Sequence, residues 1–199
     1  LKEGIRKNPR EYRLYYDLGY TVYAQKLEDH ANAVKYLTAA LHHRHDRWVP
    51  RMLYRSLMLN GEHEKAIAGW TDYLAKHADT ASAPVARKFI VRNQGHLAER
   101  EARKLLAAAA VDREEAKAAL DEGKTALAAE LEKKVEEKIA SAEEYNKKAK
   151  EAWQRMMAED MDPGFALTKL QILAAEDHAE AGRYYEANAL LEVARWETT

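Results

Sequence analysis

A small residue recurs along this chain, and a large apolar residue follows it each time at the same distance. The four pairs, each separated by four residues, are Ala33 and Leu37, Ala66 and Trp70, Ala149 and Trp153, and Ala187 and Leu191. A spacing of four places both side chains on one face of a helix. The alanine lets a neighbouring helix approach closely, and the larger residue fills the next layer of the contact. The pattern therefore predicts several amphipathic helices that pack against one another.

The composition supports an all-α chain. Only 8 Gly and 4 Pro occur in 199 residues, whereas 47% of the residues are apolar and 33% are charged, a balance typical of helices. The absence of Cys excludes disulfide scaffolds, thiolate zinc sites and cysteine nucleophiles. No apolar run reaches the roughly 18 residues that a membrane-spanning helix needs, so we expect no transmembrane segment in this stretch.

The chain begins at Leu1 and lacks the charged head and apolar middle of a signal peptide. We expect it to be a fragment whose natural N-terminus lies upstream, and we therefore assign no compartment from the sequence.

Glycines mark two of the expected turns between helices. Gly61 and Gly182 each stand five residues before a recurring alanine, where a short turn needs a permissive backbone. Ala33 and Ala66 are 33 residues apart, close to the length of about 34 residues that is known for one class of helix–turn–helix repeat. The spacing therefore favours a repeat protein made of helix pairs.

With these features the chain resembles the tetratricopeptide repeat family. The segments that carry the resemblance are YRLYYDLGYTVY with HANAVKYLTAALHH, WVPRMLYRSLML with EKAIAGWTDYLAKH, and ALTKLQILAAEDHA with YYEANALLEVARW. In the first repeat, Leu18 and Gly19 form the large–small pair at the helix contact, but the turn glycine is missing and extra residues occur around 26–32. The resemblance implies a right-handed α-solenoid of helix–turn–helix repeats. The expected divisions are 1–9 as the tail helix of a preceding repeat, 10–45, 46–80, 81–163 and 164–199 as repeats one to four.

The middle of the chain departs from the repeat pattern. Residues 101–148 carry two small-residue stripes with the spacing of a coiled coil, interrupted by Asp112 and Lys138. Gly123 stands between the stripes, and Thr125 after it is expected to cap the second helix. We therefore predict that an antiparallel coiled-coil hairpin, residues 103–147, is inserted in the third repeat, and we call it the arm. The alternative is one continuous helix through Gly123. The stripes consist of Ala102, Leu105, Ala109, Ala116 and Ala119, then Ala128, Leu131, Val135, Ala142, Tyr145 and Ala149.

The sequence offers little for catalysis or nucleic-acid binding. No pattern of nucleophile, base and orienting residue is visible, and DEGKT at 121–125 lacks the earlier glycine and the strand of a phosphate-binding loop. The net charge is −1 and no nucleic-acid motif is present. We expect neither an enzyme nor a cofactor.

A histidine cluster suggests one alternative chemistry. His42, His43, His45 and Asp46 have spacings that can chelate a metal ion at the end of a helix. The same imidazoles could instead pair with the exposed carbonyls at a helix C-terminus. A metal-binding module at this cluster is therefore an alternative function, and no metal site is assigned.

The resemblance implies a binding surface on the concave face, which the first helix of each repeat lines. Tyr and Arg suit recognition because rings and planar donor forks add contact at low ordering cost. Arg51 and Arg55 lie one turn apart and could hold a carboxylate, whereas the tyrosines could instead simply pack the next helix. Trp70, Trp153, Met156 and Met157 are expected in the core. The candidate partner-binding residues are Tyr16, Tyr20, Tyr23, Trp48, Arg51, Arg55, Arg92 and His96.

These observations predict a non-catalytic protein–protein interaction scaffold or adaptor, as an accessory or assembly subunit of a larger complex. The partner would be another protein or a peptide, and the arm would add docking area. A second hypothesis is a co-chaperone-like receptor for acidic peptides in the concave groove, although the Lys and Asn residues of the related carboxylate-clamp class are missing at comparable places.

Overall fold

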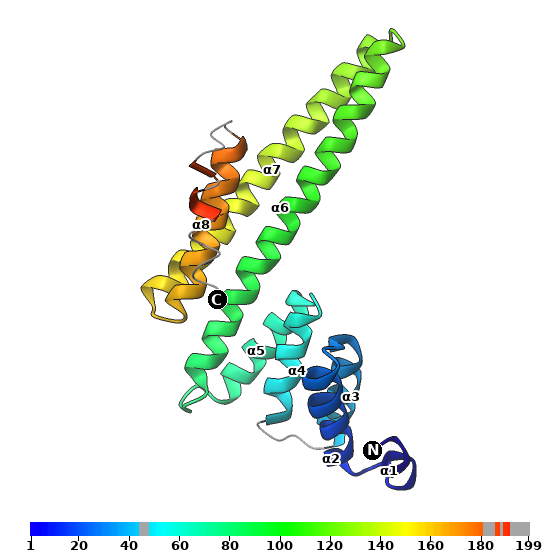
Figure 1. Cartoon of the computed structure of the whole chain (residues 1–199), viewed down its shortest axis with the longest axis vertical. Helices are drawn as coiled ribbons and strands as arrows, with labels where there is room; N and C mark the ends of the chain where they lie inside the picture. The colour runs from blue at the N-terminus through cyan, green and yellow to red at the C-terminus, as the bar shows by residue number, and fades with distance from the viewer. Residues whose placement is uncertain (44–47, 181–185, 188, 192–199) are drawn as a thin grey trace. The chain divides into compact units, whose positions relative to one another are not determined.

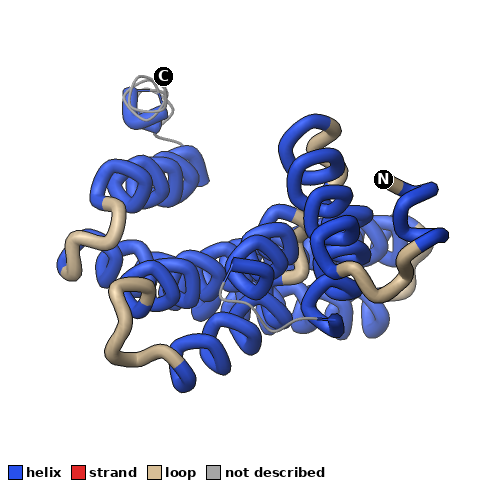
Figure 2. The backbone as a smooth tube through the Cα atoms, turned by 90° about the horizontal axis from the view of Figure 1, so that it is seen from below, coloured by secondary structure: helices blue, strands red, loops and turns tan. Residues whose placement is uncertain are grey.

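Every regular element of the described structure is a helix. The computed structural model describes residues 1–43, 48–180, 186–187 and 189–191, and no strand occurs in these ranges (Figure 1, Figure 2). By its internal contacts the chain divides into two compact units, Leu1–Asn93 and Gln94–Thr199. The prediction of an all-α chain is confirmed for the described residues.

The first unit consists of short helices connected in sequence. They are α1 (Lys2–Lys7), α2 (Tyr12–Tyr16), the π-helix η1 (Asp17–Lys26), α3 (His30–His43), α4 (Trp48–Leu59), α5 (His63–Lys76) and the start of α6 (Ala83–Asp121). Each packs on the next, since η1 contacts α3, α3 contacts α4, and α4 contacts α5. The ranges 30–43 and 48–59 are the helices that the sequence predicts.

The recurring alanines lie in the core of this unit. Ala33 and Ala66 are fully buried in one cluster with Leu37, Leu53 and Leu57. Gly19 faces the same cluster, and a Cβ there would lie 3.0 Å from Leu37 Cγ and 3.2 Å from the Ala33 carbonyl oxygen. The small residues therefore bring α3 and η1 into close contact, as the Leu18–Gly19 pair predicts.

The helix that precedes α3 differs from a regular α-helix. From Asp17 to Lys26 the backbone is a π-helix, and it ends with the Leu27 N–H donating to the Val22 carbonyl at 3.1 Å. Glu28 then adopts a positive φ of 52°, and Asp29 accepts the Asn32 N–H at 3.0 Å where α3 begins. The residues around 26–32, which exceed the expected repeat length, are thus accommodated by a wider helix and by a turn without glycine.

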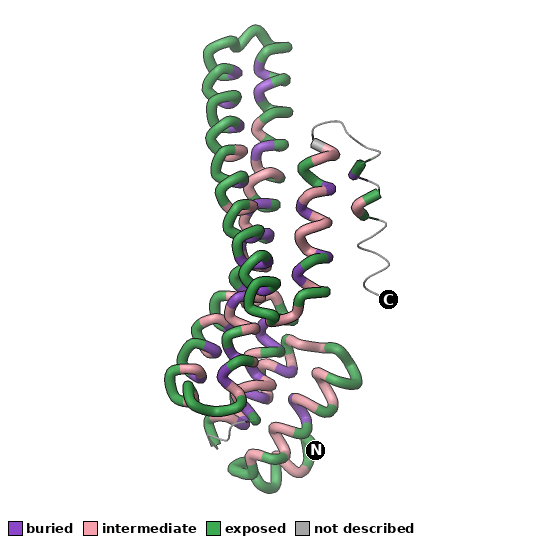
Figure 3. The backbone as a smooth tube through the Cα atoms, turned by 90° about the vertical axis from the view of Figure 1, so that its left-hand side faces the viewer, coloured by how far each residue is buried: buried purple, intermediate pink, exposed green. Residues whose placement is uncertain are grey.

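The second unit contains the rest of α6, α7 (Thr125–Ala158) and α8 (Pro163–Glu180). Helices α6 and α7 run antiparallel, because Asp112 meets Lys138 and, further from the turn, Glu99 meets Trp153. Their buried positions face each other (Figure 3). Nearly all of the two predicted stripes is buried: Ala102, Ala109, Ala116, Ala119, Ala128, Leu131, Val135, Ala142 and Ala149.

A glycine turn connects these two helices. The N–H groups of Gly123 and Lys124 donate to the carbonyls of Leu120 and Ala119, and Gly123 has a φ of 75°. This is the Schellman arrangement, and Gly61 makes the same one after α4. The alternative of a continuous helix through Gly123 is therefore wrong. The expected cap is also wrong, because Thr125 is the first helical residue and Lys124 is the N-cap, without a side-chain hydrogen bond.

Two of the expected core residues are exposed. Trp70, Trp153 and Met156 are buried as predicted, but Met157 is 38% exposed and Leu191 is 45% exposed. Met156 and Met157 are neighbours on α7 and point about 100° apart, so only one of them can face the core.

Candidate partner-binding groove

Two hollows lie along one face of the first unit, between α2–η1 and α4. The starts of α2 and α4 line the first hollow, and the later parts of η1 and α4 line the second. The two helical segments therefore run in the same direction past one groove, which we call the unit-1 groove. The first hollow is lined by Tyr12, Arg13, Tyr16, Asp17, Trp48 and Val49, and the second by Tyr20, Ala24, Gln25, His30, Met52, Arg55, Ser56 and Leu59.

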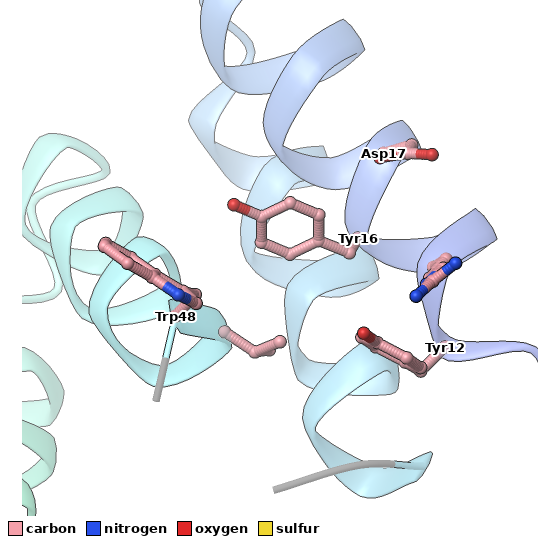
Figure 4. Close-up of a pocket in the computed structure, with 6 residues that line it drawn as sticks. Tyr12, Tyr16, Asp17 and Trp48 are labelled. Carbon is pink, nitrogen blue, oxygen red and sulfur yellow. The ribbon is translucent and has the colours of Figure 1, made fainter. Parts of the chain in front are cut away.

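The first hollow has a volume of about 270 Å³ and mainly aromatic walls. Figure 4 shows the rings of Tyr12 and Tyr16 on one side and the indole of Trp48 on the other, while Asp17 turns away from them. Trp48 is 47% exposed although it is the largest apolar side chain of the groove. An exposed aromatic wall of this kind offers contact area to a partner at low entropic cost.

A cation already lies on this aromatic wall. The Arg51 guanidinium is 5.1 Å from the centre of the Trp48 ring, within the range of a cation–π contact. The Arg51 guanidinium therefore packs on the indole of Trp48, and Arg55 lines the second hollow.

The second hollow has a volume of about 280 Å³ and carries hydrogen-bond donors. Arg55 and His30 line it, and neither Asp nor Glu is among the described residues that line it. The Tyr20 hydroxyl accepts a hydrogen bond from Gln25 Nε2 at 3.1 Å, which leaves its own proton available for donation. Arg55 is exposed, and within the described residues no ion pair of Arg55 is present. This hollow is therefore suited to an anionic group.

The remaining predicted residues lie elsewhere. Tyr23 stacks on Tyr36 of α3, with ring centres 5.2 Å apart, and does not line either hollow. Arg92 is half-buried on α6 in the first unit, and His96 belongs to the second unit. The structure thus brings Tyr16, Tyr20, Trp48 and Arg55 to the groove, with Arg51 supporting Trp48. Tyr16, Tyr20 and Tyr23 also pack partly against the core, as the alternative interpretation expected.

Sequence reasoning missed most of the residues that line the groove. Tyr12, Arg13 and Asp17 come from the helix that was already expected to line it, and Val49 and Met52 come from its counterpart α4. Their position on α2–η1 and α4, the helices expected to line the groove, is the signal that could have identified them. His30 lies at the start of α3 and carries no such signal.

The second unit contains a buried charged cluster. Glu99 is 5% exposed, and it accepts hydrogen bonds from Trp153 Nε1 at 3.0 Å and from Lys169 Nζ at 2.9 Å. His96 Nδ1 lies 3.7 Å from the same carboxylate. Burial alone would raise the pKa of Glu99, but the contacts with His96 and Lys169 outweigh it and hold this pKa at about 2. The cluster joins α6, α7 and α8 through one carboxylate.

The metal hypothesis is not tested by this structure. His42 and His43 have ring centres 5.5 Å apart, and Tyr15 packs on His43 at 5.1 Å. His45 and Asp46 lie outside the described residues. Among the residues that the structure does describe, no group of three or more His, Asp or Glu is placed to hold a metal ion.

The hydropathy of the described helices agrees with the sequence expectation, since none of them is long and apolar enough to cross a membrane. Comparison with protein-family models and with curated proteins finds no match for this chain.

Proposed function

We propose that this protein is a non-catalytic scaffold or adaptor that binds another protein, as an accessory or assembly subunit. The observation that carries the proposal is the unit-1 groove. Two helical segments, α2–η1 and α4, run past it in the same direction and supply aromatic and basic side chains from corresponding positions. A groove built in this way offers an extended surface with several separate contact points, which suits a polypeptide partner better than a small substrate.

A tetratricopeptide-like solenoid is part of this proposal. Its support is the order of packing, in which α2–η1 pairs with α3 and α4 pairs with α5. In such a solenoid the first helices of successive pairs are parallel and line one face, as α2–η1 and α4 do. The buried alanines at the same point of α3 and α5, Ala33 and Ala66, agree with a repeated unit.

The arm is the second proposed contact surface. Its α6 and α7 segments hold together through small buried residues and expose charged side chains on their outer faces. A slender hairpin of this kind adds surface for docking on a larger assembly and provides no chemistry of its own.

Affinity capture from the native host tests the proposal. We would compare the wild-type chain with a variant in which residues 103–147 are replaced by the tip sequence 120–124. Ala102 and Lys148, which the cut would join, lie at matching levels of the antiparallel pair. We expect the wild type to retain a partner protein at a constant molar ratio to itself. We expect the shortened variant to lose this partner or to bind it more weakly.

A second capture variant, Trp48→Ala, separates the groove from the arm. The exposed Arg87→Gln, away from both hollows, is the matched control. If neither variant changes the retained proteins, or if nothing is enriched over bare resin, the scaffold proposal fails.

The second candidate function is a receptor for acidic peptides. The specific observation in its favour is that Arg55 and His30 line the second hollow and that no carboxylate is among the described residues around it. A peptide array compares the wild type with Arg55→Glu, because this change reverses the charge in the second hollow. Unchanged binding of acidic peptides would reject this candidate.

A further inference from the structure

We infer that the unit-1 groove recognises an extended segment of a partner protein that presents a large apolar side chain and a carboxylate about three residues apart. The inference rests on the proposed binding function and specifies the ligand. The apolar side chain enters the first hollow, and the carboxylate lies in the second.

The walls of the first hollow decide what enters it. Tyr12, Tyr16, Trp48 and Val49 provide an apolar surface around a space of about 270 Å³. Aromatic cages of this size also bind cations, but Arg13 lines this hollow and the Arg51 guanidinium already lies 5.1 Å from the Trp48 ring centre. The Asp17 carboxylate turns away from the rings (Figure 4), so a ligand cation at the aromatic wall would meet two like charges, whereas an aliphatic or aromatic side chain would not. The first hollow therefore selects an uncharged, apolar anchor.

The second hollow favours an anionic group rather than an apolar one. Its charged and polar lining consists of Arg55, His30, Ser56, Gln25 and Tyr20, and no carboxylate is among them. Guanidinium and hydroxyl donors favour a carboxylate, which is an acceptor only. Among the described residues that line the groove, Asp17 is the one acid, and it belongs to the first hollow. The carboxylate of the ligand is therefore directed to the second hollow.

The spacing follows from α4, which lines both hollows. Trp48, at the start of α4, lines the first hollow, and Arg55, seven residues later, lines the second. Seven residues of α-helix span about 10 Å. An extended peptide covers roughly 3.3 Å per residue, so about three residues connect the anchor to the carboxylate.

Synthetic peptides test this ligand without a known partner. The probes are fluorescein-labelled nine-residue peptides of Gly, Ser and Thr that contain one Leu and one Asp, with separations from one to six residues and in both orders. Fluorescence anisotropy measures their affinity. We expect the tightest binding at a separation of about three in one order, and weaker binding when Leu is changed to Ser or Asp to Asn.

Two exposed protein positions connect the affinity to the two hollows. Trp48→Ala should weaken binding of the best peptide about tenfold, and Arg55→Gln should weaken it by a similar factor. Arg55→Gln should not change the affinity for the peptide in which Asp is replaced by Asn, because that peptide has no carboxylate for Arg55 to bind. Arg87→Gln, another exposed arginine of the first unit, is the control, and circular dichroism confirms that each variant folds.

Three results would overturn the inference. These are affinities that do not depend on the separation, affinities that follow net peptide charge alone, and affinities that neither Trp48→Ala nor Arg55→Gln changes. If host capture succeeds while every peptide fails, the scaffold proposal stands and this ligand assignment fails. If the peptides bind and host capture fails, the groove specificity stands without the assembly role.

Discussion

Gly95 shows how one small residue organises the second unit. A Cβ at this position would overlap the ring of Trp153, which is completely buried. The indole N–H of Trp153 in turn donates to Glu99, one turn further along α6. The sequence does not predict the partner of Gly95, because Trp153 is separated from it by a stretch whose fold has to be known first.

Gly95→Ala should destabilise the protein by about 1–3 kcal/mol, because a buried ring has no room to move away from the added methyl group. Gly164→Ala is the matched control: no atom lies within 4 Å of a Cβ there, and its φ is not positive. The control should be neutral or slightly stabilising. Urea unfolding of both variants measures the difference, and equal stabilities would contradict the close packing at Gly95.

The carboxylate of Glu99 makes stability depend on pH. Its pKa of about 2 in the folded chain lies below the ordinary value of 4.5. The ionised form is thus favoured by folding, and its contribution is complete above pH 4.5 and lost as the pH falls toward 2. At pH 6 we expect Glu99→Gln to be less stable than the wild type by about 2–3 kcal/mol. The gap should narrow as the pH is lowered to 2.5, which urea titrations across this range measure. A gap that stays constant would show that the carboxylate is not held in its ionised form.

At the scale of single elements, η1 is the clearest limit of the sequence-based prediction. The tetratricopeptide resemblance implies that Tyr16, Tyr20 and Tyr23 all face the groove, because they lie on the first helix of a repeat. In a π-helix the hydrogen bonds connect residues five apart, and Gln25 rather than Tyr23 lies next to Tyr20. Tyr23 consequently turns to Tyr36 on α3. No apolar pattern in the sequence distinguishes a π-helix from an α-helix, so the sequence does not reveal that Tyr20 lines the second hollow while Tyr23 packs on α3.

The two interruptions of the α6–α7 stripes are a second lesson at this scale. Asp112 and Lys138 appear as separate defects in the sequence, but in the structure they form one ion pair, with Lys138 Nζ 2.6 Å from Asp112 Oδ2. The pair is partly buried, so each residue depends on the other. The stripes themselves could be predicted because alanine spacing is a local pattern, whereas the pairing depends on the register between two helices.

This register gives a test by double substitution. Asp112→Ala alone should lower stability by about 1 kcal/mol, because it leaves the Lys138 ammonium without its partner in a partly dry contact. Adding Lys138→Ala should restore most of the loss, because the stripe is then continuous. The exposed pair of Glu130 and Lys134 on α7 is the control, and its cycle should show much weaker coupling. Additive effects at Asp112 and Lys138 would contradict the antiparallel register.

At the scale of the whole chain, the boundary between the two compact units lies at Asn93, inside α6. The sequence correctly predicts helices throughout and a turn at Gly123. The tetratricopeptide divisions and the role of the arm stay predictions. Part of the candidate site could be predicted from the sequence, because residues on the first helix of each expected repeat share a face when that helix is regular. Arg92 and His96 were carried over from the same rule, and neither lines the unit-1 groove.

Because every lining residue of the unit-1 groove belongs to Leu1–Asn93, removal of the arm should not change peptide affinity there. We expect the variant with residues 103–147 replaced by the tip sequence to bind the best Leu–Asp peptide within about twofold of the wild type. The expectation follows from the additivity of sites that share no residues, and fluorescence anisotropy measures it. A large loss of affinity would mean that the arm and the groove act together.

The antiparallel pairing of α6 and α7 also makes the length of the hairpin adjustable in steps. Residues 109 to 115 and 135 to 141 stand at matching heights on the two helices. Deleting both sets together shortens the projection by about 10 Å and keeps the small residues in phase, since seven residues complete two turns of the pattern. The length of the hairpin can therefore change during evolution, or by engineering, while α6 and α7 keep the same kind of interface.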